Sequence, residues 1–433
     1  MRRFAIVGAA LLLLAAPVSG QGAEVPTVDT GDTAFILLCA ALVMLMTPGL
    51  AFFYGGMVRS KNVLGTLMQS FVAIAVISVQ WILLGYTLAF GPDRGGFIGG
   101  FDFLGLAGVG LEPNPDYAGT IPHQAFMIYQ CMFAVITPAL ITGAIAERMR
   151  FKAYLVFIIL WATLVYDPIA HWVWAVGGYL RGMGALDFAG GTVVHISSGV
   201  SALVAAIVLG RRRGFPDDAM PPHNLPFTLL GAGLLWFGWF GFNAGSALSA
   251  GGLAVSAFVV TNTAAAAATL AWILMDWIVK GRPTALGAAS GAVAGLVAIT
   301  PAAGFVSPLA AIAIGALGGI VCFSVVSFRA KTGIDDSLDV FGVHGIGGTV
   351  GALLTGVFAS TAVNPAGADG LLHGNPKLLG IQALAVLVTW VYSAVVTFVL
   401  LKVLDAVMGL RVSTDGEEAG LDVDQHRESA YSV

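Results

Sequence analysis

Residues 190–204, GGTVVHISSGVSALV, and residues 339–354, DVFGVHGIGGTVGALL, each hold one histidine within an apolar, glycine-rich stretch. In both, a glycine follows four residues later, so that His195 precedes Gly199 and His344 precedes Gly348. Small side chains let helices approach closely or leave room for a path. A lone buried histidine is more often a hydrogen-bonded core residue than a functional one. Two histidines at matching positions favour a functional pair.

The composition places these stretches in a membrane. Of the 433 residues, 58% are hydrophobic, 10% are charged and 57 are glycine. A soluble fold of this length needs more polar residues to cover its surface, whereas a lipid bilayer accepts an apolar exterior. The class is therefore all-α integral membrane protein, because backbone polar groups inside lipid must be satisfied internally. The net charge is only -4, and no basic stripe interleaved with aromatics points to nucleic acid as a partner.

Eleven windows of about 20 apolar residues are long enough to cross a bilayer. They begin near Thr33, Val63, His123, Lys152, Thr192, Pro226, Gly252, Thr284, Ser307, Asp339 and Lys377. Before them, a charged start, an apolar run and a small-residue end predict a cleavable signal peptide over residues 1–23, with an uncleaved first helix as the alternative. The membrane domain then covers residues 24–410. Residues 411–433 form a polar, acidic tail that we expect to be solvated and disordered.

Loop charge predicts how the chain is oriented. Alternate loops are basic and hold Arg59, Lys61, Arg148, Arg150, Lys152, Arg211, Arg212, Arg213, Lys280, Arg282, Arg329 and Lys331. The loops on the other side hold only Arg94, Arg181 and Lys377. Because cytoplasmic loops carry the excess of Lys and Arg, we predict that the mature N-terminus lies outside and the C-terminal tail lies in the cytoplasm.

The two histidine stretches also suggest an internal duplication. Approximate repeats cover residues 33–210 and 226–361, with five spans each, and a last helix covers residues 377–408. Because five is an odd number, the two halves must enter the membrane from opposite faces. Inverted repeats of this kind share a site near the midplane of the bilayer.

Two facing imidazoles suit a small amine. Away from water an imidazole tends to be neutral, with one ring nitrogen donating and the other accepting a hydrogen bond. A pair can therefore share a proton, or hydrogen-bond a neutral amine without demanding a dehydrated charge. A zinc site is the competing interpretation, but it needs a third ligand that the sequence does not supply. The three cysteines, Cys39, Cys131 and Cys322, lie in apolar stretches without paired spacing.

Two carboxylates precede the histidines. Asp187 lies eight residues before His195, and Asp339 lies shortly before His344. Each can cap the start of its helix by accepting backbone N–H bonds, which is the expected local role, and Asp187 can also attract cations to a pore mouth.

Aromatic residues cluster in three further strings, at Trp236, Trp239, Phe240 and Phe242, at Tyr129 and Phe133, and at Trp172 and Trp174. Most membrane aromatics are packing residues or interface anchors. At the mouth of an apolar path, however, ring faces attract a desolvating cation by roughly 0.5 to 2 kcal/mol. A nearby hydroxyl such as Ser246 can accept an N–H bond from the same cation.

At these residues the chain resembles the Amt/Mep/Rh ammonium transporter family, and in particular its bacterial Amt branch. The resemblance covers the whole mature chain. It rests on the strings TPGLAFFYGGMVRSKN (47–62), TGAIAERMRF (142–151), YDPIAHWVWAVGGYL (166–180), DFAGGTVVH (187–195), GWFGFNAGSA (238–247), DVFGVHG (339–345) and GLDVDQHRESAY (420–431).

The resemblance implies a homotrimer of eleven-helix protomers, each with its own pore between two inverted five-helix repeats. It implies that Phe133 and Phe242 are the stacked phenyl rings that block the outer vestibule. It also implies that Trp174 and Ser246 form the external ammonium recruitment site, where cation–π attraction and a hydroxyl acceptor bind the ion.

Further residues match the family by position. Tyr129 and Trp239 match aromatic positions near the recruitment site. Asp187 matches the acidic residue needed for substrate binding and helix-end geometry, and His195 with His344 matches the twin histidines that line the pore.

Two residues depart from what the resemblance implies. Tyr129 stands where bacterial relatives commonly carry phenylalanine, so its hydroxyl is expected to alter affinity at the vestibule. Asp167 stands in the fourth span, where an apolar residue is expected.

The implied function is transport of ammonium or methylammonium across a bacterial inner membrane, by a protein that is not an enzyme and needs no cofactor. Ammonium would lose its proton near the phenyl pair and ammonia would pass the histidines, with a proton relay between them as an open option. A secondary role in nitrogen sensing, through a PII-type protein at the cytoplasmic face, is compatible with transport. The alternatives are a Rh-like gas channel and a membrane metalloenzyme that uses both histidines.

Overall fold

The computed structural model of the chain describes residues 27–329 and 331–431, and their regular structure is almost entirely helical. The first half contains α1 (Thr30–Met57), η1 (Ser60–Asn62), α2 (Val63–Gln80), η2 (Trp81–Gly85), α3 (Tyr86–Phe90), η3 (Phe101–Leu106), α4 (His123–Ile145), α5 (Phe151–Trp161), η4 (Ala162–Tyr166), α6 (Asp167–Trp174), α7 (Tyr179–Met183), η5 (Gly191–Ile196) and α8 (Ser197–Leu209). The second half contains α9 (Leu225–Ala244), η6 (Gly245–Ala247), α10 (Gly252–Lys280), α11 (Ala285–Ile299), α12 (Pro308–Arg329), η7 (Phe341–Gly345), α13 (Ile346–Phe358), η8 (Leu371–His373), α14 (Pro376–Met408), α15 (Thr414–Ala419) and η9 (Asp422–His426). The predicted signal peptide over residues 1–23 lies outside the described residues.

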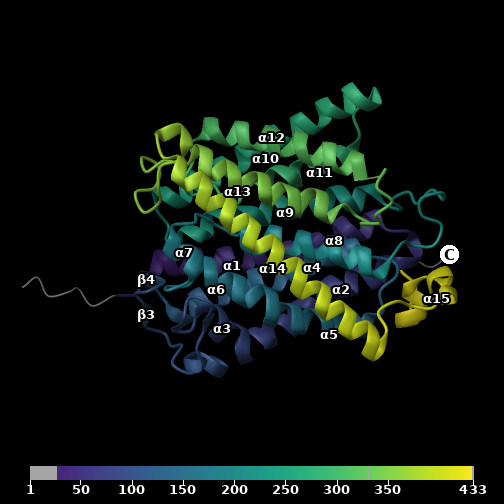
Figure 1. Cartoon of the computed structure of the whole chain (residues 1–433), viewed down its shortest axis with the longest axis horizontal. Coiled ribbons are helices and arrows are strands. Elements are labelled where there is room, and N and C mark those ends of the chain that lie inside the picture. The colour runs from purple at the N-terminus through teal and green to yellow at the C-terminus, as the bar shows by residue number, and fades with distance from the viewer. Residues whose placement is uncertain (1–26, 330, 432–433) are drawn as a thin grey trace, which may run out of the picture.

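The long helices run side by side along the long axis of the molecule (Figure 1). Short strands form two antiparallel ribbons, in which β1 (Asp93–Arg94) pairs with β2 (Ile98–Gly99) and β3 (Pro113–Asn114) pairs with β4 (Ala118–Pro122). We call the end of the molecule that carries β3, β4 and α7 the strand end, and the end that carries α15 the tail end (Figure 1).

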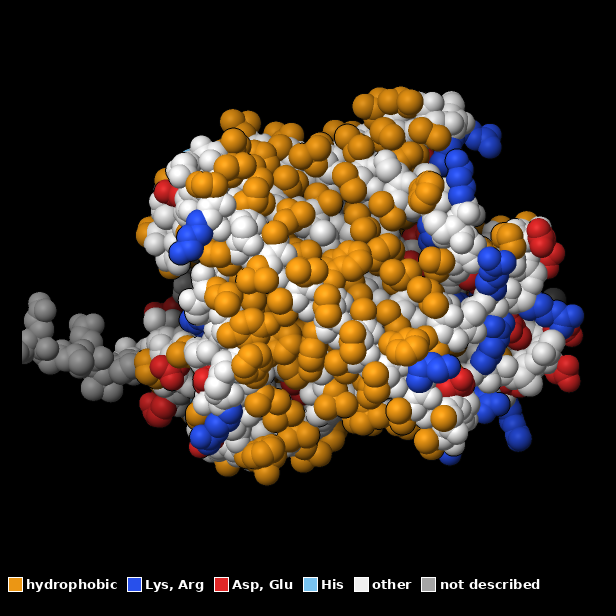
Figure 2. All heavy atoms as spheres, in the orientation of Figure 1, with side chains coloured by type: hydrophobic (Ala, Val, Ile, Leu, Met, Phe, Trp, Pro, Cys, Tyr) orange, Lys and Arg blue, Asp and Glu red, His pale blue; other side chains and the backbone are white. Residues whose placement is uncertain are grey.

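Ten helical stretches in the described part of the chain are long and apolar enough to cross a membrane. Figure 2 shows hydrophobic side chains over the middle of one face, with charged side chains gathered at the two ends. The prediction of an all-helical, multi-pass membrane protein is therefore confirmed. Of the eleven predicted spans, the eighth corresponds to α11, which has only 15 residues. At 1.5 Å per residue a helix of this length covers about 22 Å, so eleven spans stay a prediction.

Residue types at the helix ends explain where one of these stretches begins and where another ends. The side chain of Asn224 accepts the N–H of Phe227 at 3.0 Å, and Pro226 occupies the first turn of α9, where a missing N–H costs nothing. Helix α10 ends at Gly281, whose φ of 75° is the left-handed conformation that favours glycine.

The two histidine stretches touch at their glycines. A Cβ atom added at Gly199 would overlap the backbone of Gly345, and one added at Gly348 would lie 2.8 Å from the carbonyl oxygen of Gly191. The shared spacing of four residues between histidine and glycine thus lets the segments η5–α8 and η7–α13 approach backbone to backbone.

We expect Gly199→Ala to destabilise the protein by about 1–3 kcal/mol, because the added methyl overpacks a backbone contact that cannot move aside. Thermal unfolding of the detergent-solubilised protein measures this. The matched control is Gly233→Ala in α9, where an added Cβ meets no atom within 4 Å in the described part of the chain. That variant should be unchanged or slightly more stable, and equal losses for both variants would contradict the close contact.

The C-terminal tail, residues 411–431, is folded against the tail end, which corrects the prediction of a disordered tail. The carboxylate of Asp422 is 2% exposed and accepts the N–H groups of Leu64 at 3.0 Å and Gly65 at 2.8 Å. Lys61 Nζ donates to the carbonyl oxygens of Glu417 at 3.1 Å and of the following residue at 2.5 Å. The tail is therefore ordered, because the groups that bind it belong to the start of α2 and to a basic segment far away in the sequence.

A buried ionic cluster holds the loops together at the tail end. Arg212 is bonded to both carboxylate oxygens of Asp335, with Nη2 at 2.8 Å from Oδ1 and Nε at 2.9 Å from Oδ2. Glu147 is paired with Arg59 at 2.6 Å and with Arg212 at 3.4 Å. Burial alone would raise the pKa of Asp335, but the hydrogen bonds and charge of Arg212 outweigh it and hold this pKa below its usual range. The pKa of Glu147 is lowered by the same balance, with Arg59 and Arg212 opposing desolvation.

This cluster predicts loss of stability in acid. A carboxyl whose folded pKa is lowered contributes stability above its unfolded pKa of about 4, and this contribution disappears as the pH falls through the folded pKa. We therefore expect the thermal unfolding temperature of the wild type to decrease once the pH is lowered below about 4. At neutral pH, Asp335→Asn should lower the free energy of unfolding by about 3 kcal/mol, since it leaves Arg212 buried without its charge partner. Acidification should then lower the stability of this variant less than that of the wild type. Parallel pH profiles for the two proteins would contradict this account.

Candidate functional site

The two histidines of the sequence motifs meet in the interior. The Nδ1 atoms of His195 and His344 are 3.2 Å apart and their ring centroids are 5.3 Å apart. Both residues are buried, with 1% and 3% of their surface exposed. Within the described residues, Nε2 of His195 has no hydrogen-bond partner. The contact between the Nδ1 atoms needs one shared proton, which leaves a ring nitrogen of the pair free for a guest.

The local structure that positions His195 resembles the one that positions His344. Both lie in π-helical turns, η5 and η7, a conformation that is rare and frequent at functional sites. Asp187 accepts the N–H groups of Gly190 at 2.9 Å and Gly191 at 2.6 Å through Oδ1. Its Oδ2 accepts the N–H groups of the next two residues, at 2.8 and 3.2 Å. The carboxylate is thus used in capping η5, the local role that the sequence favoured.

The corresponding cap at η7 is Asp336 and not Asp339, which corrects the sequence prediction. Asp336 accepts the N–H groups of Val340 at 3.1 Å and Phe341 at 2.8 Å. It lies eight residues before His344, the same spacing as in the first half. The carboxylate of Asp339 turns instead to Arg329, with Nε at 2.5 Å from Oδ1.

Aromatic rings lie against the histidines. Phe133 from α4 and Phe242 from α9 are in contact, with their ring centroids 4.3 Å apart and their planes tilted by 37°. Phe242 stacks in turn on His195 at 6.0 Å, and Trp239 stacks on His195 at 5.3 Å. Trp239 is held by a hydrogen bond from Nε1 to the hydroxyl of Thr300 at 2.9 Å. The predicted phenyl pair therefore lies directly beside the histidine pair.

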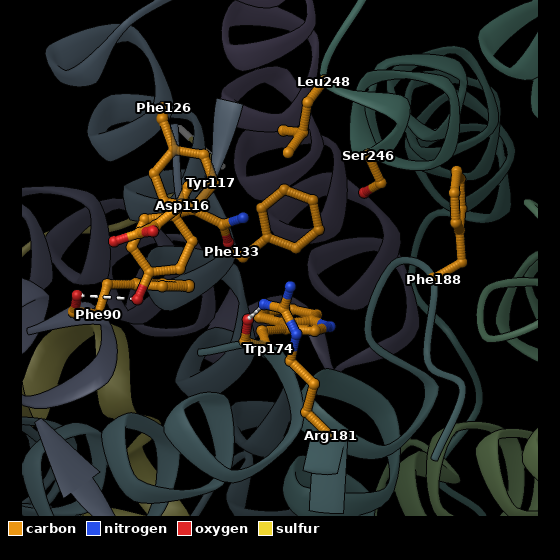
Figure 3. A pocket seen from close by; sticks show the side chains of 11 residues that line it. Phe90, Asp116, Tyr117, Phe126, Phe133, Trp174, Arg181, Phe188, Ser246 and Leu248 are labelled. Carbon is orange, nitrogen blue, oxygen red and sulfur yellow. Dashed lines mark hydrogen bonds between the residues drawn. The ribbon is translucent and has the colours of Figure 1, made fainter. Parts of the chain in front are cut away.

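A cavity of about 140 Å³ lies at the strand end, on the far side of Phe133 from the histidines. Its lining includes Trp174 and Ser246, as Figure 3 shows. Trp174 packs edge-on against Phe133, with ring centroids 5.8 Å apart, and its Nε1 donates to the carbonyl oxygen of Asp187 at 2.9 Å. An indole face and a hydroxyl oxygen thus border one small cavity that ends at a phenyl ring.

Four other sequence candidates lie outside this lining. The hydroxyl of Tyr129 lies 2.9 Å from the carbonyl oxygen of Phe242 and 3.2 Å from Ser246 Oγ. Its effect is therefore to tie α4 to the end of α9. Trp172 packs on Tyr392, whereas Phe240 stacks on Phe258. The carboxylate of Asp187 faces backbone N–H groups, so direct contact with a substrate stays a prediction.

A second, smaller cavity of about 40 Å³ begins at the other side of the pair. Its lining includes His344 and, toward the tail end, Met57, Leu338 and Asp339. Two cavities on opposite sides are therefore separated by the two phenyl rings and the paired imidazoles. This arrangement can pass a small polar molecule only if side chains move slightly, and it offers hydrogen bonds at the midpoint.

Sequence reasoning missed several residues that line the first cavity. Phe126 and Gln130 precede Phe133 on α4 at spacings of seven and three residues, so helical periodicity could have found them. Asp116, Tyr117 and Arg181 come from the loop before α4 and from α7, and only the fold brings them in. Arg181 donates to the carbonyl oxygen of Trp174 at 2.5 Å, which fixes the edge of the cavity.

In the part of the chain that the structure describes, no group of three His, Cys, Asp or Glu residues is placed to hold a metal ion. A third ligand next to His195 and His344 is missing there, and the residues around them are aromatic or small. A buried imidazole pair between two small cavities, in a chain whose described part has ten helices long and apolar enough to cross a membrane, defines the class as a multi-pass membrane transport protein.

Comparisons with known proteins identify the family. The model of the Ammonium Transporter Family matches residues 34–431. An ammonium transporter from Bacillus subtilis is 58% identical over 402 residues, which cover 93% of this chain and 98% of the relative. The crystal structure of Mep2 from Saccharomyces cerevisiae has a TM-score of 0.84 and 39% identity, covering 90% of this chain and 88% of that one. A structure titled "Sensor Amt Protein" has a TM-score of 0.84 and 31% identity, covering 92% of this chain and 98% of that one. The chain belongs to the ammonium transporter family.

Proposed function

We propose that the protein takes up ammonium from the strand end and conducts it as ammonia past His195 and His344 to the tail end. The observation that carries this proposal is the pair of Nδ1 atoms 3.2 Å apart, buried between two cavities. Stripping water from an ammonium ion costs many kcal/mol, more than ring contacts return. Moving the neutral amine past the pair avoids most of this cost.

Capture takes place in the cavity at the strand end. The ring of Trp174 attracts the cation, and Ser246 Oγ accepts one of its N–H bonds. Tyr129 holds Ser246 and the end of α9 in position through its hydroxyl. The proton leaves ammonium near Phe133 and Phe242, because the rings beyond offer no water to a charged ion.

Potassium ions are excluded by the same chemistry, since they have no proton to give up. The freed proton is relayed by the two imidazoles, whose Nδ1 contact already shares one proton, so that net ammonium is taken up. If the relay operates, an electrical current should accompany uptake in proportion to it. This current can be measured with the protein reconstituted in a supported bilayer.

The architecture we propose is eleven spans in two inverted five-helix repeats with a final helix, assembled as a homotrimer. Support for the repeats comes from the matched carboxylate caps, π-helical turns, histidines and glycines of the two halves. Support for assembly comes from an apolar groove between α10 and α12, in which Ala266, Ala267, Ala271 and Ala316 lie among larger side chains such as Leu270 and Ile312. Small residues allow helices of separate copies to approach closely in a membrane.

We place the strand end outside the cell and the tail end in the cytoplasm of a bacterium, across its inner membrane. Figure 2 shows Lys and Arg gathered most densely at the tail end, in line with the excess of positive charge on cytoplasmic loops. Ammonium would then enter at the cavity lined by Trp174 and leave past Asp339.

Uptake of radiolabelled methylammonium into liposomes containing the purified protein tests this function. We expect saturable uptake that unlabelled ammonium competes away and that potassium leaves unchanged. Liposomes without protein set the background. Uptake equal to that background, or competition by potassium as strong as by ammonium, would reject the proposal.

Nitrogen sensing is a second candidate function, favoured by the ordered tail. Lys61 from η1 and Arg213 from the loop before α9 hold the tail segment around Glu417, with the backbone N–H of Arg213 at 2.7 Å from Glu417 Oε1 and the guanidinium of Arg213 paired with Glu418. We propose that a PII-type protein docks on this face and reads the loops and tail together. A purified PII-type protein should bind the solubilised transporter and lose affinity for an Arg213→Glu variant; absence of binding at saturating concentration would count against the role.

A further inference from the structure

Asp167 is a carboxyl group inside the membrane domain that the proposed transport path does not use. It is the first residue of α6, directly after the π-helical turn η4, and is 0% exposed. Its neighbour Gln80 is the last residue of α2, directly before the π-helical turn η2, and is 8% exposed. The two side chains thus meet where two neighbouring spans both leave regular α-helical geometry.

In the amide of Gln80 both N–H bonds of the nitrogen are hydrogen-bonded, whereas the oxygen has no hydrogen-bond partner among the described residues. Nε2 donates to Asp167 Oδ2 at 2.8 Å and to Thr163 Oγ1 at 3.1 Å, which accounts for both N–H bonds. Among the described residues, Asp167 Oδ1 and Gln80 Oε1 have no hydrogen-bond partner, although both atoms are buried. The two orphaned atoms belong to the same carboxyl and the same amide that are already joined.

No cation compensates a charge on Asp167 within the described chain, where it takes part in none of the ion pairs. Other buried carboxylates differ in this respect. Asp276 has Lys280 Nζ at 2.8 Å, and Asp187 accepts four backbone N–H bonds. An isolated carboxylate inside a membrane protein is costly, so it takes up a proton or a partner.

We infer that Asp167 is a proton-binding site: a neutral carboxylic acid whose proton is shared with Gln80 Oε1. One proton on Oδ1 supplies a donor for the orphaned amide oxygen and removes the uncompensated charge. The acid and the amide then form a closed pair of two hydrogen bonds, O–H to amide oxygen and N–H to acid oxygen. The pair ties α2 to α6 without a charge in the membrane, and it gives the protein a bound proton apart from the two histidines.

Infrared difference spectroscopy of the purified protein at pH 7 tests the inference, because the C=O stretch of a protonated carboxyl is separate from carboxylate and amide bands. The spectrum of the wild type minus Asp167→Asn should contain an acid C=O band that moves in D2O. Gln80→Leu should shift this band, since the acid loses its amide partner. The matched control is Asp276→Asn, which should remove carboxylate bands only.

Asparagine reproduces the neutral acid, because its N–H can donate to Gln80 Oε1 while its oxygen accepts from Nε2. Asp167→Asn should therefore keep its thermal midpoint and retain methylammonium uptake within about twofold of the wild type, less than 1 kcal/mol. Carboxylate bands in place of the acid band in the difference spectrum would overturn the inference. Should Asp167→Asn fail to fold, an acid band that is unchanged in Gln80→Leu would overturn it equally.

Discussion

Uptake of methylammonium is expected to fall about a hundredfold or more when His195 and His344 are both replaced by alanine. The two rings are the hydrogen-bonding groups between the cavities, with Nδ1 atoms 3.2 Å apart and surroundings of stacked aromatic rings. Loss of two buried hydrogen-bond partners, at about 1.5 kcal/mol each, raises the barrier to ammonia by about this factor. Any residual flux should also lose its preference for ammonium over potassium, because water can now enter between the cavities.

The experiment compares initial uptake rates in liposomes loaded to equal protein content. His373→Ala is a matched control, since this histidine is exposed in η8 at the strand end and is not among the residues that line either cavity. The control should transport like the wild type. Unchanged rate and unchanged selectivity in the double variant would refute a role for the imidazole pair in conduction.

Replacement of Asp187 by alanine should abolish uptake and destabilise the protein by about 3–5 kcal/mol, through loss of several buried hydrogen bonds at once. Its carboxylate accepts four backbone N–H groups at the start of η5, between 2.6 and 3.2 Å. Without it these donors are left unsatisfied, and the turn that carries His195 is no longer held. Its backbone carbonyl also receives the indole N–H of Trp174, so the cavity edge is expected to shift as well.

Thermal unfolding and methylammonium uptake should be measured on the same preparation. Asp187→Asn retains one acceptor oxygen and should fall between alanine and the wild type. Asp102→Ala serves as the control, because this carboxylate is exposed and makes only a 3.5 Å pair with Arg94, worth less than about 1 kcal/mol. A stable Asp187→Ala protein that transports normally would show that the cap is dispensable.

The pairing of His195 with His344 illustrates how far sequence reasoning reached. The common spacing to glycine and the matching position in each half predicted that the two side chains face each other, and they do. Phe133 and Phe242, which the family resemblance pairs, lie in contact with their rings tilted by 37°, whereas their role as a block of the vestibule stays a prediction. The cap at η7 was misplaced by three residues, because Asp336 and Asp339 are both acidic and only the turn of the chain decides which one points inward.

Sequence reasoning failed at the tail for a different reason. Residues 411–431 are acidic enough to remain solvated on composition alone, yet Asp422 and Glu417 are nearly fully buried. Their partners, Leu64 and Gly65 at the start of α2 and Arg213 in a loop, are separated from the tail by two hundred residues or more. Composition reports what a segment can do by itself, whereas burial of a charge depends on which distant donors reach it.

The sequence by itself determined the class, since 58% hydrophobic residues in long windows can be solvated only by lipid, and it also determined the family and the two histidines. Tertiary structure decided what the polar atoms do. It assigned Tyr129 to a backbone tie, Asp336 to the cap of η7 and Asp167 to an amide partner on another span. The physical reason is that hydrophobic burial depends mainly on how much apolar surface a segment carries, which can be counted along the chain. A hydrogen bond depends on the distance and direction of one partner, which only the packed fold supplies.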